Sequence, residues 1–343
     1  IGSGSSGGTI TLGTITAGSV TFTNFSGTYT LNSGTLTNSG LTVSPSAGNV
    51  TISSPKLMGS GGLTKQGSGV LFLGNKNNAY TGDTVVEDGV LQLGSGWQNA
   101  NAIPGGIGAA TSGSNLEING GNVRIAYYLK RTLGDGAGQL QITGGTSGFS
   151  HVQPDTYGRI TINNSTSYEI VWGSAYWNPE VLVLNEYDAV PNQVVNIQNK
   201  IDLNGTNRTV ACNSTRTASN VNANNGNIAT TGGRLTGIIR NTGATAAGLI
   251  KTGPGYLQLT AANTYDGDTT VNEGTLEIQQ ANANNDSSTF TIGTGTVVKL
   301  TYSGADTVDS LYVGGTQMVA GVYGHTDSSA DNGGMGVGAL DAY

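Results

Sequence analysis

The chain has 343 residues, a formal net charge of −7 and only 10% charged residues. Glycine occupies 56 positions, about twice its usual share. The 14 basic residues are spread thinly along the chain and form no basic cluster of the kind that binds nucleic acid. There is no apolar run of about 18 residues and no basic leader followed by an apolar stretch, so we expect no transmembrane segment and a mature secreted chain.

The first 60 residues combine a flexible N-terminal segment, 1–8, with a regular periodicity of apolar residues. From residue 9 to about 63, apolar pairs alternate with Thr or Asn and return about every ten residues, a pattern typical of half-buried strands. The pairs are Ile10/Leu12, Val20/Phe22, Tyr29/Leu31, Leu41/Val43 and Val50/Ile52. This spacing predicts two or three strands per coil of a β-solenoid, at roughly 25 residues per coil.

Residues 62–94 and 248–279 are two copies of one pattern. Each begins G-L-x-K-x-G-x-G-x-L-x-L and continues N-x-Y-x-G-x-T, so Lys65 corresponds to Lys251 and Tyr80 to Tyr265. The first copy predicts strands at 70–73, 84–86 and 90–93, bounded by Gly, Asn or Asp. Three short strands within about 30 residues favour one coil of a parallel β-solenoid. A hairpin meander is the alternative, with Asp88-Gly89 as a candidate tight turn.

The segment between the copies continues the strand pattern. Residues 95–113 lack alternation and are predicted to leave the coil, and strands resume from 115 to 212. Residues 213–233 are almost wholly polar and predict a loop or a degenerate coil. No apolar stripe of helical period persists for three turns, so the prediction is an all-β fold with almost no helix.

The repeated pattern resembles the autotransporter-associated β-strand repeat, also called the passenger-associated transport repeat. Residues 131–138, 144–150, 171–173 and 199–210 resemble segments of long secreted members of this family, and 305–343 resemble their closing segment. The resemblance implies a β-helix that is secreted and displayed on a bacterial surface, or extracellular. We therefore expect one solenoid over residues 1–343.

Few residues are candidates for chemistry. His151 and His325 are expected to be exposed in turns, and Asp266 and Asp268 to be solvated turn residues rather than calcium ligands. Cys212 is expected to be a buried apolar residue, with an intermolecular disulfide or a reactive thiol as alternatives. The sequence thus predicts no catalytic residue, no metal site, no cofactor and no enzyme.

Aromatic residues gather at 172–177. Trp172, Tyr176 and Trp177 are a candidate platform for sugar rings, with anchoring of large loops against the solenoid as the alternative. The platform would make surface glycans a partner of the chain.

The pattern as a whole predicts an extracellular structural protein that forms a homopolymer by end-to-end contacts and has an adhesive role. Ile10 and Leu12 at one end and Val337 and Leu340 at the other are the candidate assembly residues, because an uncapped solenoid leaves strand edges unpaired. The alternatives are a glycan-binding adhesin module and a β-helix enzyme acting on polysaccharides.

Overall fold

A computed structural model describes residues 1–343 except 2–3, 5, 46–47, 95–101, 109, 154–155, 187–192, 215–231, 282–284, 303–304, 322, 324–338 and 342–343. The chain groups into two compact units. Unit 1 comprises residues 1–153, 157–164 and 174–180, and unit 2 comprises 154–156, 165–173 and 181–343. The single body expected over 1–343 stays a prediction.

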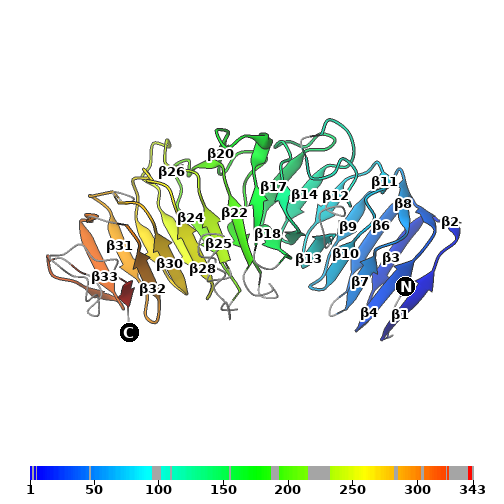
Figure 1. Ribbon diagram of the computed structural model, residues 1–343, viewed down its shortest axis with the longest axis horizontal. Helices are drawn as coiled ribbons and strands as arrows, with labels where there is room; N and C mark the ends of the chain where they lie inside the picture. Colours follow the sequence, from blue (N-terminus) through cyan, green and yellow to red (C-terminus); the bar gives the residue numbers. More distant parts are fainter. Residues whose placement is uncertain are drawn as a thin grey trace. The chain divides into compact units, whose positions relative to one another are not determined.

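Unit 1 is built from short parallel strands in three sheets (Figure 1). Its first sheet contains, in order, β1 (Gly7–Thr11), β4 (Thr28–Asn32), β7 (Asn49–Ile52), β10 (Val70–Leu73), β13 (Val90–Leu93), β15 (Asn122–Ile125) and β18 (Thr146–His151). The second contains β2 (Thr14–Thr16), β5 (Thr35–Thr37), β8 (Lys56–Gly59) and β11 (Ala79–Tyr80). The third contains β3 (Ser19–Thr23), β6 (Gly40–Ser44), β9 (Leu63–Lys65), β12 (Thr84–Val86), β14 (Leu116–Asn119) and β17 (Leu140–Gly144). A further pair joins β16 (Tyr128–Leu129) to β19 (Thr156–Ile160).

Successive coils of unit 1 stack with a constant register. Tyr29 pairs with Val50, and Val50 with Leu71, so each coil repeats after 21 residues. The regular coil is therefore shorter than the roughly 25 residues expected from the sequence. Each such coil supplies one strand to each sheet, which confirms the parallel β-solenoid and leaves no role for an Asp88-Gly89 hairpin, because β12 and β13 lie in different sheets.

The core is a set of in-register apolar rows. In the first sheet of unit 1 one row joins Leu31, Ile52, Leu73, Leu93 and Ile125. All five are buried, as period-two alternation requires for the inward side of a strand. The aliphatic residues of both repeat copies are buried as well, namely Leu71, Leu73, Leu91, Leu93, Leu257, Leu259, Leu276 and Ile278.

Unit 2 repeats this plan. Its first sheet contains β21 (Val181–Leu184), β24 (Arg208–Ala211), β27 (Leu249–Thr252), β29 (Thr269–Val271), β31 (Thr289–Ile292), β33 (Ser310–Val313) and β34 (Thr316–Gln317). Its second contains β22 (Gln193–Ile197), β25 (Gly232–Leu235), β28 (Tyr256–Leu259), β30 (Thr275–Ile278), β32 (Val297–Leu300) and β35 (Ala339–Asp341). A three-stranded sheet contains β20 (Glu169–Val171), β23 (Lys200–Asp202) and β26 (Ile239–Arg240).

The repeated sequence pattern covers more than one coil, which corrects the expectation of one coil per copy. In the first copy β9 pairs with β12 and β10 with β13, so the two halves of the copy stack on each other. The second copy does the same through β27 with β29 and β28 with β30. Other coils are longer, with 32 residues between Gln92 and Arg124 and 41 between Asn207 and Gly248.

The described ends of the two units differ. Strands β1, β2 and β3 form the edges of the sheets of unit 1, whereas β34 and β35 pair antiparallel with β33 and β32 in unit 2. Within the described residues the one helical segment is the 3₁₀ turn η1 (Ile162–Asn164). No helix in this part of the chain has the length and apolarity needed to cross a membrane.

Candidate functional site

The lysine of the first repeat copy is buried and clamps two coils together. Lys65 alternates with Leu63 on β9, so its side chain faces inward, and it is fully buried. Its Nζ donates to the carbonyl oxygens of Gln66 (2.8 Å) and Gly67 (2.5 Å) in its own turn. A third bond goes to the carbonyl of Asp88, 3.0 Å away in the next coil. The ammonium thus satisfies backbone groups of two coils.

The second copy reproduces this arrangement. Lys251 Nζ donates to the carbonyls of Thr252 (2.8 Å), Gly253 (2.6 Å) and, in the next coil, Glu273 (3.0 Å). Burial lowers the pKa of Lys251, an effect that Cys212 and Glu273 oppose. An ammonium group has three N–H donors, and three carbonyl acceptors are present, so each donor of Lys251 has a partner.

A second shared feature is a buried tyrosine beside a threonine. The hydroxyl of Tyr80 lies 2.8 Å from Thr84 Oγ1, and that of Tyr265 lies 2.6 Å from Thr269 Oγ1. Burial raises the pKa of Tyr265 to about 12, the hydrogen bond to Thr269 opposing it. Such a phenol stays protonated at neutral pH and is a structural hydrogen-bonding group.

The asparagines of the motif hold the preceding coil. Asn78 Oδ1 accepts the backbone N–H of Leu57 (2.8 Å), and Asn263 Oδ1 accepts that of Ile239 (3.0 Å). Both asparagines are buried. The amide of Asn78 also donates to the Ala102 carbonyl (2.8 Å), so this side chain bridges three segments.

Arg131 is the largest buried cation of unit 1. It is fully buried, and its guanidinium donates to the carbonyls of Gly106 (2.8 Å), Ser114 (2.7 Å), Gln139 (3.1 Å) and Pro104 (3.0 Å). Burial lowers its pKa to about 10, partly offset by Tyr80. The side chain therefore stays charged at neutral pH and anchors the inserted residues near 104–106 to the coil.

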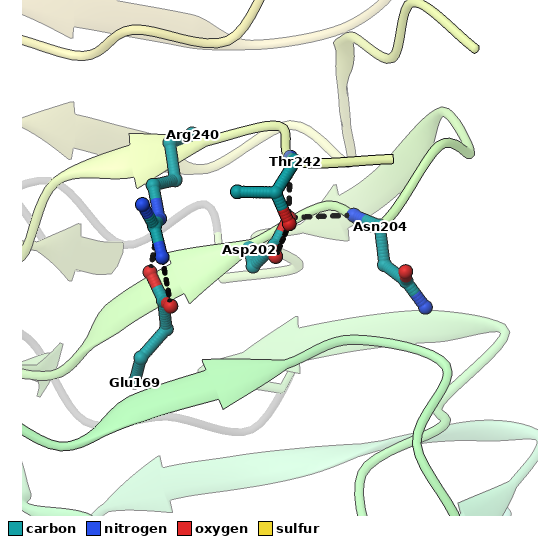
Figure 2. Close-up of polar contacts among 5 residues, drawn as sticks. All are labelled: Glu169, Asp202, Asn204, Arg240 and Thr242. Carbon is teal, nitrogen blue, oxygen red and sulfur yellow. Dashed lines mark hydrogen bonds and ion pairs between the residues drawn. The ribbon is translucent and has the colours of Figure 1, made fainter. Parts of the chain in front are cut away.

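On the three-stranded sheet of unit 2 an ion pair spans non-adjacent strands. Figure 2 shows the guanidinium of Arg240 on β26 facing the carboxylate of Glu169 on β20, with β23 between them. The contact is bidentate, from Nε to Oε1 and from Nη2 to Oε2. Arg240 is about half exposed, and Glu169 raises its pKa. Both carboxylate oxygens of Glu169 are therefore occupied.

Asp202 lies beside this pair and caps a loop (Figure 2). Its Oδ1 accepts the backbone N–H groups of Asn204 (2.9 Å) and Thr242 (3.0 Å), and its Oδ2 accepts the Thr242 hydroxyl. Burial alone would raise the pKa of Asp202, but the bonds from Thr242 and Asn204 outweigh it and, with Arg240, hold the pKa below its usual value. Figure 2 shows the Asn204 side chain pointing away from the cluster.

This cluster has the residue types of a hydrolytic site but not the electrostatics. A glycosidase needs one carboxyl group with a raised pKa as general acid, whereas Asp202 is held ionised and Glu169 is fully paired. In the described part of the chain, no three His, Cys, Asp or Glu side chains gather as metal ligands. The cluster is best explained as a cross-strand brace.

The aromatic platform is not supported by the positions of its tryptophans. Trp172 and Trp177 are buried, so neither ring has a free face for a sugar, and only Tyr176 of the three is exposed. Trp177 packs on Phe149 in unit 1, and in unit 2 the carbonyl of Trp172 accepts a bond from Arg208. Each tryptophan ring has a large apolar surface, and its burial is therefore favourable.

His151 corrects a second expectation. It lies at the end of β18 and is fully buried, not exposed in a turn, and its Nε2 lies 2.7 Å from the Ala126 carbonyl. Burial lowers its pKa to about 4, the bond to Ala126 opposing this, so the ring is neutral at physiological pH. His325 lies outside the described residues.

Other expectations for single residues hold. Cys212 is fully buried, and burial raises its pKa, so it is a small core residue. Asp266 and Asp268 are exposed, and each accepts one backbone N–H, from Ala247 (3.1 Å) and Thr289 (2.8 Å) respectively. They are solvated turn residues that also tie neighbouring coils.

The candidate assembly residues lie at the ends of the sheets. Leu12 is mostly buried just after β1, and Ile10 on β1 is half-buried. Leu340 lies on β35 and pairs with Val298 of β32, and Val337 lies outside the described residues. Pairing of the Leu340 strand within the chain was not expected from the sequence.

Sequence reasoning missed the roles of Lys65, Lys251 and Arg131. Charged residues are normally exposed, which hides a buried cation. A signal was present for the lysines: both lie two residues after an inward leucine, on the same side of their strand, and both recur at the same place in the copies.

Comparison with protein families gives one match. The family model of the passenger-associated-transport-repeat matches residues 63–93 and 249–278. The chain carries two passenger-associated transport repeats. The match indicates a β-helix like those of autotransporter passengers, and the family of this repeat is one of secreted or surface-exposed bacterial proteins. No curated protein and no solved structure has significant similarity to the chain.

Proposed function

We propose that this chain is an extracellular structural protein of a bacterial surface, a stiff solenoid that acts as a scaffold and not as an enzyme. The observation that supports this most is the use of the repeat's polar side chains. In both copies the lysine, the asparagine and the tyrosine are buried and bonded to the coil itself. Side chains committed in this way are not available to bind or activate a substrate.

The scaffold assembles end to end through the first coil of unit 1, and the occupant of that edge is a second copy of the chain. Ile15 on β2 is 39% exposed, whereas Leu36, its in-register neighbour one coil further in, is 4% exposed. The first coil thus leaves an apolar residue exposed beside β1 and β2, which are the edge strands of their sheets, a surface that accepts an added strand.

The backbone hydrogen bonds of Ile1 support strand addition at this edge. Its N-terminal amine donates to the Thr21 carbonyl (2.8 Å), and the Thr23 N–H donates to its own carbonyl (3.1 Å). Residue 1 therefore already pairs with the outer edge of β3. A strand from a second copy would extend the same ladder, and a heterologous contact of this kind propagates into a filament.

Sedimentation velocity at increasing concentration tests the assembly. We expect the unmodified chain to form larger species as concentration rises, and the Ile15→Lys variant to remain monomeric. Thr270→Lys, on the outer side of β29, is the matched control and should assemble normally. A monomer at every concentration, or assembly by Ile15→Lys equal to that of the control, contradicts the proposal.

A glycan-binding adhesin is the second candidate function. The observation that favours it is a polar cluster on the second sheet of unit 2, where Tyr256, Glu277 and Lys299 lie together. A polysaccharide-active enzyme is disfavoured, because the acidic residues that converge on the three-stranded sheet are saturated by donors.

A further inference from the structure

Two asparagine–glycine dipeptides lie at turns that the structure describes. The sequence has four of them, and those at 225–226 and 332–333 lie outside the described residues. In unit 1, Asn119 ends β14 and Gly120 follows it, and in unit 2 Asn204–Gly205 follows β23. Both asparagines are exposed, so water reaches their side-chain amides.

The backbone of these turns favours glycine after asparagine. Gly120 has a φ of +107° and Gly205 a φ of +72°, which glycine adopts without steric cost. A Cβ on Gly120 would also lie 2.6 Å from the carbonyl oxygen of Glu87. Asn204 itself has a φ of +54°, a conformation that asparagine tolerates better than most residues. The fold therefore selects the Asn–Gly pair at these turns for its shape.

The same pair is chemically labile. The glycine nitrogen, which no neighbouring Cβ shields, loses its proton to the solvent and attacks the side-chain carbonyl carbon of the asparagine. A C–N bond forms, ammonia leaves, and the product is a cyclic imide. Water then opens the ring at either carbonyl, giving aspartate or isoaspartate. Each event adds a negative charge, and isoaspartate also lengthens the backbone, which disturbs the register of stacked strands.

In unit 1 the glycine nitrogen is held by Ser147. The N–H of Gly120 donates to Ser147 Oγ at 2.7 Å, and the serine hydroxyl donates in turn to the carbonyl of Gly144 at 2.6 Å. Ser147 lies on β18 and is fully buried, so water does not compete for its oxygen. This bond both occupies the N–H and fixes the peptide plane that would have to rotate for attack.

In unit 2 the same task falls to Asn241. The N–H of Gly205 donates to Asn241 Oδ1, also at 2.7 Å. Asn241 is oriented by its own amide, which donates to the carbonyl of Thr245 (2.8 Å) and to Asp266 Oδ1 (2.8 Å). Figure 2 shows the side chain of Asn204 pointing away from this loop. The acceptors lie 27 and 36 residues from the glycines they hold, so the fold supplies them and the turns do not.

We propose that Asn119 and Asn204 are deamidation sites that the folded chain protects, with Ser147 and Asn241 as the positioning residues. Each of the two withdraws the attacking nitrogen of its glycine by a short hydrogen bond, so the cyclic imide forms only when that bond opens. The inference concerns the chemical durability of the chain. It holds whether or not the chain assembles end to end.

Peptide mapping of the full chain after incubation at mildly alkaline pH tests the proposal, because fragmentation locates each converted asparagine. We expect slow conversion at both sites in the native parent and fast conversion at both in guanidinium chloride. Ser147→Ala should accelerate conversion at Asn119 alone and Asn241→Ala at Asn204 alone. The expected factor is about tenfold, which corresponds to one hydrogen bond at the upper end of its usual net strength.

Matched controls separate loss of the acceptor from loosening of the turn. Thr143→Val removes a hydrogen bond to Glu117 between the same strands as the first site, and Thr242→Val removes one to Asp202 beside the second. Neither touches the glycine nitrogens, so neither should accelerate conversion.

Thermal unfolding identifies the folded variants, and Ser147→Ala, which removes a single hydroxyl, decides alone if Asn241→Ala does not fold. Three results overturn the proposal. They are conversion in the native parent as fast as in denaturant, an unchanged rate at the matching site of a folded variant, and equal acceleration by the valine controls.

Discussion

Lys65 and Lys251 lie at equivalent positions of two turns in separate units, and each donates to two carbonyls of its own turn and one carbonyl of the next coil. The repeat therefore marks a structural joint between stacked coils. Glycines beside the clamp leave room for it: a Cβ on Gly89, whose φ is +63°, would lie 2.7 Å from Lys65 Nζ.

Close contact between coils predicts a strong effect at Gly69. A Cβ there would lie 1.8 Å from the Gly48 carbonyl oxygen, a backbone atom that cannot move aside cheaply. Gly69→Ala should destabilise unit 1 by at least about 2 kcal/mol. Gly13→Ala, where a Cβ meets nothing within 4 Å, is the control. Chemical denaturation of both variants provides the measurement, and equal midpoints would show that the coils are packed less closely.

The inward face is tested at Leu257. This side chain is fully buried between Gly233 and Leu276 of neighbouring strands. Leu257→Asp would bury an unpaired charge and should cost about 4 kcal/mol, while Thr270→Asp on an outer side should have little effect. If both variants melt at the temperature of the unmodified chain, the strand faces are assigned the wrong way round.

His151 predicts a pH dependence of stability. Its pKa of about 4 in the folded chain lies below the ordinary value of 6.5, so the unfolded chain binds more protons between these values. Stability contributed by the neutral ring is complete above pH 6.5 and is lost as pH falls toward 4, by at most about 3 kcal/mol. His151→Gln should flatten this part of the profile. Parallel profiles for the two proteins would show that the ring is not buried.

The sequence predicts the strands and their inward side well, because period-two alternation of Leu, Ile and Val with Thr records which side is buried. It predicts coil length less well. Pairing register depends on where a turn brings the chain back, and the longer separations between Gln92 and Arg124 and between Asn207 and Gly248 interrupt the 21-residue period.

The buried polar groups were the hardest to predict. A lone His151 in a polar stretch and a Lys65 in a strand both resemble surface residues, because sequence does not show which carbonyls a fold leaves to be satisfied. The clustering of Trp172 and Trp177 likewise suggested a surface role, yet both side chains are buried. The sequence could not predict the Glu169–Arg240 ion pair, because the two residues are 71 positions apart.

The central claim is that the signature lysine of the repeat serves the stacked backbone and not a ligand. Its most direct test is the unfolding free energy of Lys251→Met, which keeps the length of the side chain but removes all three donors. Leaving three buried carbonyls unpaired should cost about 3 kcal/mol, whereas Lys200→Met, at an exposed position of the same unit, should be close to neutral. Equal stability of Lys251→Met and Lys200→Met would contradict the account.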